Sequence, residues 1–166
     1  MPRFLYLMRH AQSAEKQPGQ ADKDRELTPQ GMRDAQQAGR YLIQEKINLD
    51  LVISSTAVRA RQTTENISRV FDLNVDQIQF EEVLYAASVP ALLALITQMD
   101  EQYTHVLYVG HNPIISYLAE YLTKAAIGDM PPAAIAMIKF DATHWEEVNQ
   151  GSGELIALVT PENIKS

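Results

Sequence analysis

Short apolar runs alternate with helix-like segments along the chain, and this alternation is the feature that most restricts its fold. Apolar runs lie at 4–8, 51–53, 78–80 and 106–109, and each precedes a segment in which apolar residues recur at helical spacing. Parallel strands connected by helices are buried on both faces of their sheet. Because 166 residues is about the size of one domain, we expect a single-domain three-layer α/β/α sandwich with a mostly parallel sheet.

Capping residues next to prolines mark the starts of several expected helices. Thr28 precedes Pro29, and Ser88 stands two residues before Pro90, each at the beginning of a helical pattern. Asn112 precedes Pro113 in the same way, so we expect Asn112 to be the N-cap and Pro113 a first-turn residue. The expected helices cover 29–43, 59–71, 89–99 and 114–122.

The remaining segments complete one domain over 1–166. Apolar runs at 133–140 and 155–159 are expected to close the sheet as strands, antiparallel at its edge. The polar stretch 12–26 is long enough to be a functional loop rather than a tight connection. Residues 160–166 are expected to form a loose C-terminal tail.

Two histidines follow two of the apolar runs. Arg9 and His10 come directly after the run at 4–8, and His111 comes after Gly110, which ends the run at 106–109. In an open α/β sheet, ligands collect at the carboxyl ends of the strands, where backbone N–H groups and helix N-termini favour anions. Two histidines at such places, one of them beside an arginine, indicate phosphate chemistry.

Charge and composition exclude several classes of function. A formal net charge of -7 argues against nucleic-acid or anionic-membrane partners, since both need a cationic face. The chain has no cysteine and therefore no thiolate nucleophile. No two histidines stand at a metal-ligand spacing beside a carboxylate, so we expect neither a metal nor another cofactor. The first apolar run is too short for a signal peptide or a membrane span, which makes the cytoplasm the expected location.

Three motifs in register resemble the histidine phosphatase superfamily. They are Arg9-His10, the segment 55–63 and the segment Gly110-His111-Asn112-Pro113, and their order and intervals fit over nearly the whole chain. The segments 24–31 and 84–86 are most similar to the SixA-like phosphohistidine phosphatases. The resemblance implies a phosphoglycerate mutase-like fold and one histidine phosphatase domain.

The residue types in these motifs suit phosphoryl transfer. His10 can be the nucleophile, because a neutral imidazole has a lone pair at working pH and attack gives a phosphohistidine intermediate. Arg9, Arg59 and Arg25 offer fork-shaped donors that match phosphate oxygens. His111 adds a donor if it is protonated. Weaker hydrogen bonds are expected from two further residues, Ser13 and Asn112.

Each of these arginines also has a simpler interpretation. Arg59 could be a helix-surface residue paired with Glu65 or Asp72, and Arg61 is expected to be one. Arg25 stands in the charged cluster 22–26, which is typical of a solvated loop.

A proton donor for the leaving group is the least defined part of the site. Glu82 lies where the mutase-like branch of the superfamily carries its acidic donor, and Glu81 competes with it because neighbouring residues of a strand face opposite ways. A departing alkoxide needs such a proton, whereas a departing imidazole, with a pKa of about 6.5, leaves with little help. An ineffective Glu82 would therefore favour phosphohistidine substrates.

These observations predict a metal-independent phosphatase that works through a phosphohistidine at His10. The usual Gly-Glu after the Arg-His pair is here Ala11-Gln12, which weakens a phosphoglycerate mutase interpretation. Only about thirty residues separate Glu82 from His111, too few for a large lid, so an open site that accepts a phosphoprotein, possibly a phosphotransfer domain, is favoured. Two alternatives remain: a phosphomonoesterase of small phosphorylated substrates, and a phosphate-binding scaffold without turnover.

Overall fold

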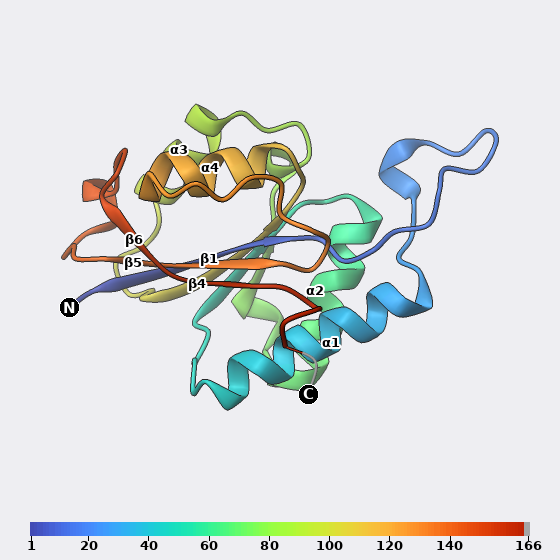
Figure 1. The fold of residues 1–166 in the computed structure, drawn as a ribbon, viewed down its shortest axis with the longest axis horizontal. Helices are drawn as coiled ribbons and strands as arrows, with labels where there is room; N and C mark the ends of the chain where they lie inside the picture. The colour runs from blue at the N-terminus through green and yellow to red at the C-terminus, as the bar shows by residue number, and fades with distance from the viewer. Residues whose placement is uncertain (165–166) are drawn as a thin grey trace.

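A six-stranded mixed sheet forms the centre of the computed structural model, which describes residues 1–164 (Figure 1). In spatial order the strands are β3-β2-β4-β1-β5-β6; the first four are mutually parallel, while β5 and β6 run antiparallel at one edge. The mostly parallel sheet and its antiparallel edge are therefore confirmed. The strands are β1 (Arg3–Arg9), β2 (Leu51–Ser54), β3 (Ile78–Phe80), β4 (His105–Gly110), β5 (Ile135–Phe140) and β6 (Gly153–Val159).

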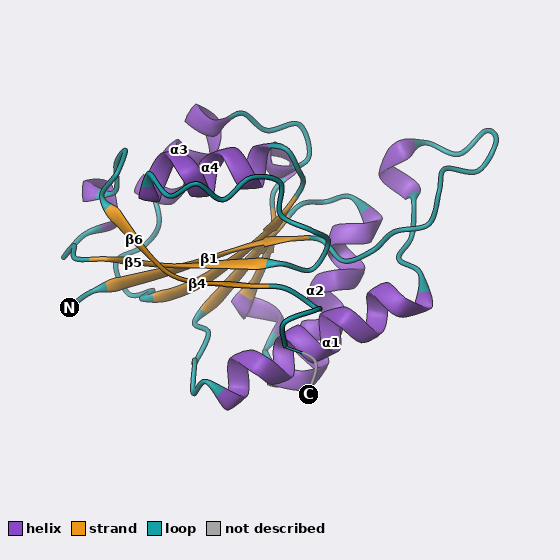
Figure 2. Cartoon of the chain, in the orientation of Figure 1, coloured by secondary structure: helices purple, strands orange, loops and turns teal. Residues whose placement is uncertain are grey.

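Four α-helices cover the two faces of the sheet and form the two outer layers of the expected three-layer sandwich (Figure 2). The pair α1 and α2 lies on one face, and the pair α3 and α4 lies on the other. The helices are α1 (Pro29–Gln44), α2 (Val58–Phe71), α3 (Val89–Thr97) and α4 (Ile114–Thr123), and the 3₁₀ turns are η1 (Asp22–Asp24), η2 (Val75–Gln77), η3 (Glu82–Leu84) and η4 (Trp145–Glu147).

Burial on both faces explains why the strands read as continuous apolar runs. In β1, Leu5 and Leu7 belong to the core under α3 and α4, while Tyr6 and Met8 belong to the core under α1 and α2. All four are at most 2% exposed. Successive side chains of a strand point to opposite faces, so a strand covered on both sides needs apolar residues at every position.

The helix starts at Thr28 and Ser88 are confirmed. The Thr28 hydroxyl accepts the Gly31 N–H at 3.0 Å, and the Ser88 hydroxyl accepts the Ala91 N–H at 3.2 Å. At Gly31 the first turn of α1 also lies so close to the segment after β1 that a Cβ atom would overlap the carbonyl oxygen of Gln12. Glycine is thus required where α1 passes the segment after His10.

The expectation that Asn112 caps α4 is wrong. The N-cap is Pro113, which has no side-chain cap, and the peptide bond between Asn112 and Pro113 is cis. The Asn112 amide donates instead to the carbonyl of Met130 at 3.0 Å and accepts the Ser116 hydroxyl at 2.7 Å. These bonds connect α4 to the segment before β5, and they take the polar atoms that a cap would use.

Beyond β6 the described chain ends in a short turn. The Asn163 N–H donates to the Thr160 carbonyl at 3.1 Å, and Ile164 packs against the core under α1 and α2. Residues 165–166 of the expected tail lie outside the described residues, so the looseness of that end stays a prediction. Within 1–164, no helix is long and apolar enough to cross a membrane.

Candidate active site

The sheet order brings the two strand-tip histidines together. β1 and β4 are parallel neighbours in which Arg9 is in register with Gly110, so the next residue of each strand lies at the same edge. The ring centroids of His10 and His111 are 5.1 Å apart. β2 lies on the other side of β4, and its following residue, Ser55, contacts His111.

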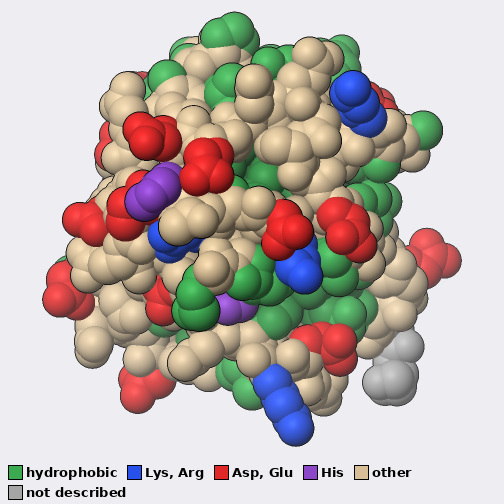
Figure 3. Space-filling model, turned by 90° about the vertical axis from the view of Figure 1, so that its left-hand side faces the viewer, with side chains coloured by type: hydrophobic (Ala, Val, Ile, Leu, Met, Phe, Trp, Pro, Cys, Tyr) green, Lys and Arg blue, Asp and Glu red, His purple; other side chains and the backbone are tan. Residues whose placement is uncertain are grey.

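A cleft of about 290 Å³ opens in front of these histidines. Every predicted site residue except Glu82 lines it. The lining residues are Arg9, His10, Gln12, Ser13, Arg25, Arg59, His111, Asn112 and Pro132. Three guanidinium groups therefore meet at this edge, although Asp and Glu side chains are spread over the opposite end of the molecule (Figure 3). The local excess of positive charge suits an anion in a chain whose net charge is -7.

Two hydrogen bonds fix the state of the His10 ring. Nδ1 lies 2.8 Å from the Ala11 carbonyl, which can only accept, so this nitrogen carries the hydrogen. Nε2 accepts from Arg59 Nε at 3.3 Å, and its lone pair therefore faces the arginine. Burial lowers the pKa of His10 to about 3. The ring is thus neutral at physiological pH, with its hydrogen on Nδ1 and its lone pair on Nε2.

His111 is also neutral in the ligand-free site. Its Nε2 lies 2.8 Å from the Ser55 hydroxyl, which itself accepts the Ala57 N–H at 3.1 Å and so has its hydrogen available for the imidazole. Burial, reinforced by the charge of Arg59, lowers the pKa of His111 to about 4. His111 would act as a cationic donor only when protonated, and a bound anion would favour protonation by raising its pKa.

Arg59 points into the site rather than to solvent. Its side chain is 7% exposed, and its terminal nitrogens donate to the Asp22 carbonyl at 2.8 Å and the Asp22 carboxylate at 3.1 Å. Pairing with Glu65 or Asp72 is therefore the wrong interpretation. Arg61, two residues further along α2, stacks on the Phe80 ring at 4.3 Å and is exposed. The helix thus turns these two arginines to different surroundings.

Arg9 and Arg25 both line the cleft. Arg9 directly precedes His10 in the sequence, and Arg25 belongs to the loop that follows it. One terminal nitrogen of Arg9 donates to the Met130 carbonyl at 2.9 Å. Arg25 Nε lies 3.1 Å from the Asp22 carboxylate, and the Arg25 side chain is 23% exposed. The charged cluster 22–26 is thus partly folded over the site rather than fully solvated.

Glu82 lies outside the cleft lining. Its side chain is 63% exposed, and its carboxylate accepts the Lys23 ammonium at 2.8 and 2.6 Å. The hydrogen bond from Lys23, followed by one from Thr56, lowers the pKa of Glu82, so the group is ionised near neutral pH. A role for Glu82 as proton donor stays a prediction, and its ionised state disfavours that role. Glu81 does not line the cleft either.

Three contact residues of the site were not singled out from the sequence. Ser55 holds His111, and Tyr85 donates its hydroxyl to the Asp22 carboxylate at 2.9 Å while its ring packs edge-on against His111. Ser55 could have been found, because it follows an apolar run just as His10 and His111 do. Asp22 has no such signal, since it stands among charged residues that resemble a solvated loop.

The sequence and the fold match those of histidine phosphatases. Residues 5–85 match the family model of the histidine phosphatase superfamily (branch 1), and the chain belongs to this superfamily. It is 35% identical to an uncharacterized protein of Mycobacterium tuberculosis over 165 residues, which cover 93% of this chain and 99% of that protein. It is 25% identical to the phosphohistidine phosphatase SixA of Escherichia coli, covering 97% of this chain and 96% of that protein.

A solved structure gives the same result for the fold. The protein histidine phosphatase SixA complexed with tungstate superposes with a TM-score of 0.82 at 26% identity, over 99% of this chain and 100% of that chain. The SixA-like resemblance and the phosphoglycerate mutase-like fold expected from the motifs are thereby confirmed.

Proposed function

We propose that this chain is a phosphatase that removes phosphoryl groups from protein side chains and prefers phosphohistidine. The observation that supports this most directly is the state of His10. Its ring is neutral and desolvated, and the Nε2 lone pair faces a cleft lined by arginines. A nucleophile in that state needs no base to activate it.

The reaction follows from these positions in two steps. In the first, a bond forms between phosphorus and His10 Nε2 while the bond from phosphorus to the substrate nitrogen breaks. The departing imidazole keeps the electron pair and takes up a proton from solvent. In the second, water attacks the phosphorus that is now bound to His10 Nε2, and the bond between phosphorus and Nε2 breaks. Inorganic phosphate and the neutral ring are released. Arg9, Arg25 and Arg59 neutralise the equatorial oxygens. Ser13, Asn112 and a His111 that gains a proton in the complex add weaker donors.

The choice of substrate rests on the leaving group. No neutral carboxylic acid lines the cleft within residues 1–164, and Glu82 is ionised and held by Lys23. An alkoxide leaves poorly without a proton, whereas an imidazole leaves near its own pKa of about 6.5. The relative SixA is named a phosphohistidine phosphatase, and tungstate, which it binds, is an oxyanion like phosphate. A phosphoprotein partner such as a phosphotransfer domain, in the cytoplasm, is consistent with this chemistry.

Single-turnover labelling tests the proposal. The enzyme is mixed in excess with a protein carrying ³²P-phosphohistidine and, separately, with a labelled sugar phosphate. We expect the label from the phosphoprotein to appear on His10 as an acid-labile adduct and then as inorganic phosphate. Efficient turnover of the sugar phosphate alone would support the small-molecule phosphomonoesterase, and binding without turnover of either would support the scaffold.

His10→Ala is the matching variant. We expect it to abolish turnover and the acid-labile adduct while it still binds inorganic phosphate weakly, because the three arginines remain. Steady-state rates and calorimetric phosphate titration measure the two properties. Substantial turnover in a clean preparation of this variant would rule out His10 as the nucleophile.

A further inference from the structure

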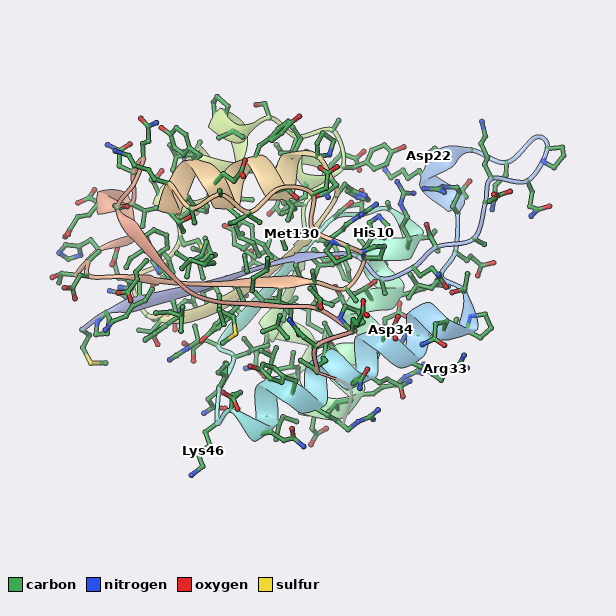
Figure 4. All side chains as sticks on the ribbon, in the orientation of Figure 1. His10, Asp22, Arg33, Asp34, Lys46 and Met130 are labelled. Atoms are coloured by element: carbon green, nitrogen blue, oxygen red, sulfur yellow. The ribbon has the colours of Figure 1, made fainter. Side chains whose placement is uncertain are left out.

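Arg59 is held on two sides, and only one of them is the nucleophile. Its Nε donates to His10 Nε2, whereas both terminal nitrogens donate to Asp22, one to the backbone carbonyl and one to the carboxylate. Asp22 comes from the η1 turn, and His10 comes from the end of β1 (Figure 4). A guanidinium is planar and rigid, so anchoring its two terminal nitrogens fixes the direction of the Nε–H bond.

Asp22 is itself held in place by two other residues of the site. Tyr85 donates its hydroxyl to the same carboxylate oxygen that Arg59 contacts, at 2.9 Å, and Arg25 Nε lies 3.1 Å from the other oxygen. The Tyr85 hydroxyl, together with Arg59 and Arg25, holds the pKa of Asp22 below its usual range. The carboxylate is therefore charged at neutral pH and links three groups around the cleft.

We propose that Asp22 is a positioning residue of the proposed phosphatase reaction, which aims Arg59 Nε–H at the point where the transferring phosphoryl group meets His10 Nε2. The inference rests on the proposed function for the identity of the reacting atoms, and on the hydrogen bonds of Arg59 with Asp22 and His10 for the geometry. Asp22 does not itself line the cleft and makes no hydrogen bond to His10; it acts through the lining residue Arg59.

The same contacts imply a cost in ground-state affinity. An anionic ligand that enters the cleft competes with the Asp22 carboxylate for the donors of Arg59 and Arg25, and it meets a like charge nearby. Asp22 therefore weakens the binding of free phosphate while it improves the alignment of Arg59 during the transfer. Removing Asp22 is therefore expected to raise the affinity for free phosphate and to lower kcat. These opposite effects distinguish a positioning role from a purely binding role, because interactions made in the ground state do not by themselves raise the rate.

Two substitutions separate the charge from the hydrogen bonds. Asp22→Asn removes the charge but keeps an oxygen that can accept from Arg59 and Tyr85. Asp22→Ala removes both. The matched control is Asp24→Ala, which removes the same charge from the same turn; the Asp24 side chain is exposed and has no hydrogen bond or ion pair within residues 1–164.

The experiment measures kcat on a phosphohistidine protein and the dissociation constant of inorganic phosphate by calorimetry, with thermal unfolding to show that each variant folds. We expect Asp22→Ala to lower kcat about tenfold or more, the factor that corresponds to losing a hydrogen bond between charged groups. Asp22→Asn is expected to retain most of kcat. Both variants are expected to bind phosphate several-fold more tightly than the wild type, and Asp24→Ala to match the wild type in both measurements.

The proposal is overturned if folded Asp22→Ala keeps the wild-type kcat, or if it loses phosphate affinity in parallel with kcat as a general disruption of the site would produce. Failure of the proposed function looks different. In that case the wild type itself does not turn over the phosphoprotein, and the calorimetric comparison of phosphate binding still tests whether Asp22 competes for the arginines.

Discussion

At the scale of single residues, surroundings rather than residue type decide what each ionisable group does. His10 and His111 have lowered pKa values because burial at the cleft removes them from water. Glu82 is exposed to solvent, and its pKa is lowered because Lys23 and Thr56 donate hydrogen bonds to its carboxylate. The proposed nucleophile, His10, is thus kept neutral, and the candidate acid, Glu82, is kept ionised. Both effects point to a substrate with a good leaving group.

The two arginines of α2 test which face of this helix is turned toward the cleft. Arg59→Ala should lose at least about 2 kcal/mol of transition-state stabilisation, roughly a thirtyfold loss in kcat/KM, because it removes a donor directed at the reacting centre. Arg61→Ala should leave kcat/KM within about twofold of the wild type, since Arg61 loses only its exposed contact with Phe80. Equal losses in the two variants would contradict the orientation of α2 described here.

Glu82→Gln tests the leaving-group argument. Because the Glu82 carboxylate is ionised and outside the cleft lining, we expect kcat/KM for phosphohistidine and for an alkyl phosphate to change by less than about threefold, as for the loss of an exposed ion pair. Both rates are measured between about pH 5 and 8, where histidine titrates. A large loss confined to the alkyl phosphate would restore Glu82 as the proton donor and weaken the preference for phosphohistidine.

Sequence patterns predicted most residues that line the cleft, and missed residues such as Asp22 that contact the lining residues from a loop. Arg9, His10, Arg59 and His111 were placed at one edge, where the structure finds them. Asp22 was not, because its role depends on how the 12–26 loop folds back over α2, and a charged turn has the same composition whether it folds back or stays in solvent.

At the scale of elements, α1 passes very close to the segment that follows β1 and carries Gln12, two residues after His10. Gly31→Ala should destabilise the protein by about 1–3 kcal/mol and lower activity, since the added methyl group overlaps the Gln12 backbone and must push apart α1 and the segment after His10. Urea unfolding and kcat/KM measure the two effects.

Gly39→Ala is the control on the same helix. A Cβ atom there meets Val70 at an ordinary 3.4 Å, so this variant should be as stable as the wild type or more stable, because alanine favours a helix by up to about 1 kcal/mol. A Gly31→Ala protein with unchanged stability and activity would show that α1 can move away from β1 without consequence.

Most elements were predictable because their signals are local, and the exceptions depend on distant partners. Apolar runs and the caps at Thr28 and Ser88 gave strands and helices close to those observed. Asn112 has the same local pattern as those caps, yet its amide bonds to Met130 and Ser116. Nothing near Asn112 in the sequence announces a carbonyl eighteen residues further along the chain.

At the scale of the whole molecule, the two buried histidines link the site to stability. Both have folded-state pKa values well below the usual 6.5, at about 3 and about 4, so below pH 6.5 the unfolded chain binds protons that the folded protein does not. Their contribution to the free energy of unfolding is complete above about pH 6.5 and is lost as the pH falls toward 4.

Urea unfolding at several pH values measures this loss. We expect the free energy of unfolding of the wild type to fall between pH 6.5 and 5, and the fall to be smaller in the double variant His10→Gln/His111→Gln. His144→Gln, which replaces a histidine with a 51% exposed side chain, should keep the wild-type pH dependence. The same slope in the double variant and the wild type would mean that other groups cause the acid sensitivity.

The parallel pairing of β1 with β4 also makes the cleft depend on contacts between distant parts of the sequence. His10 and His111 stand about a hundred positions apart, and the two side chains meet only when β4 lies between β1 and β2. Contacts of such long range form late in folding. A truncated chain that lacks β4 would therefore carry His10 without its pocket, and an assembled cleft reports that the central strand has been laid into the sheet.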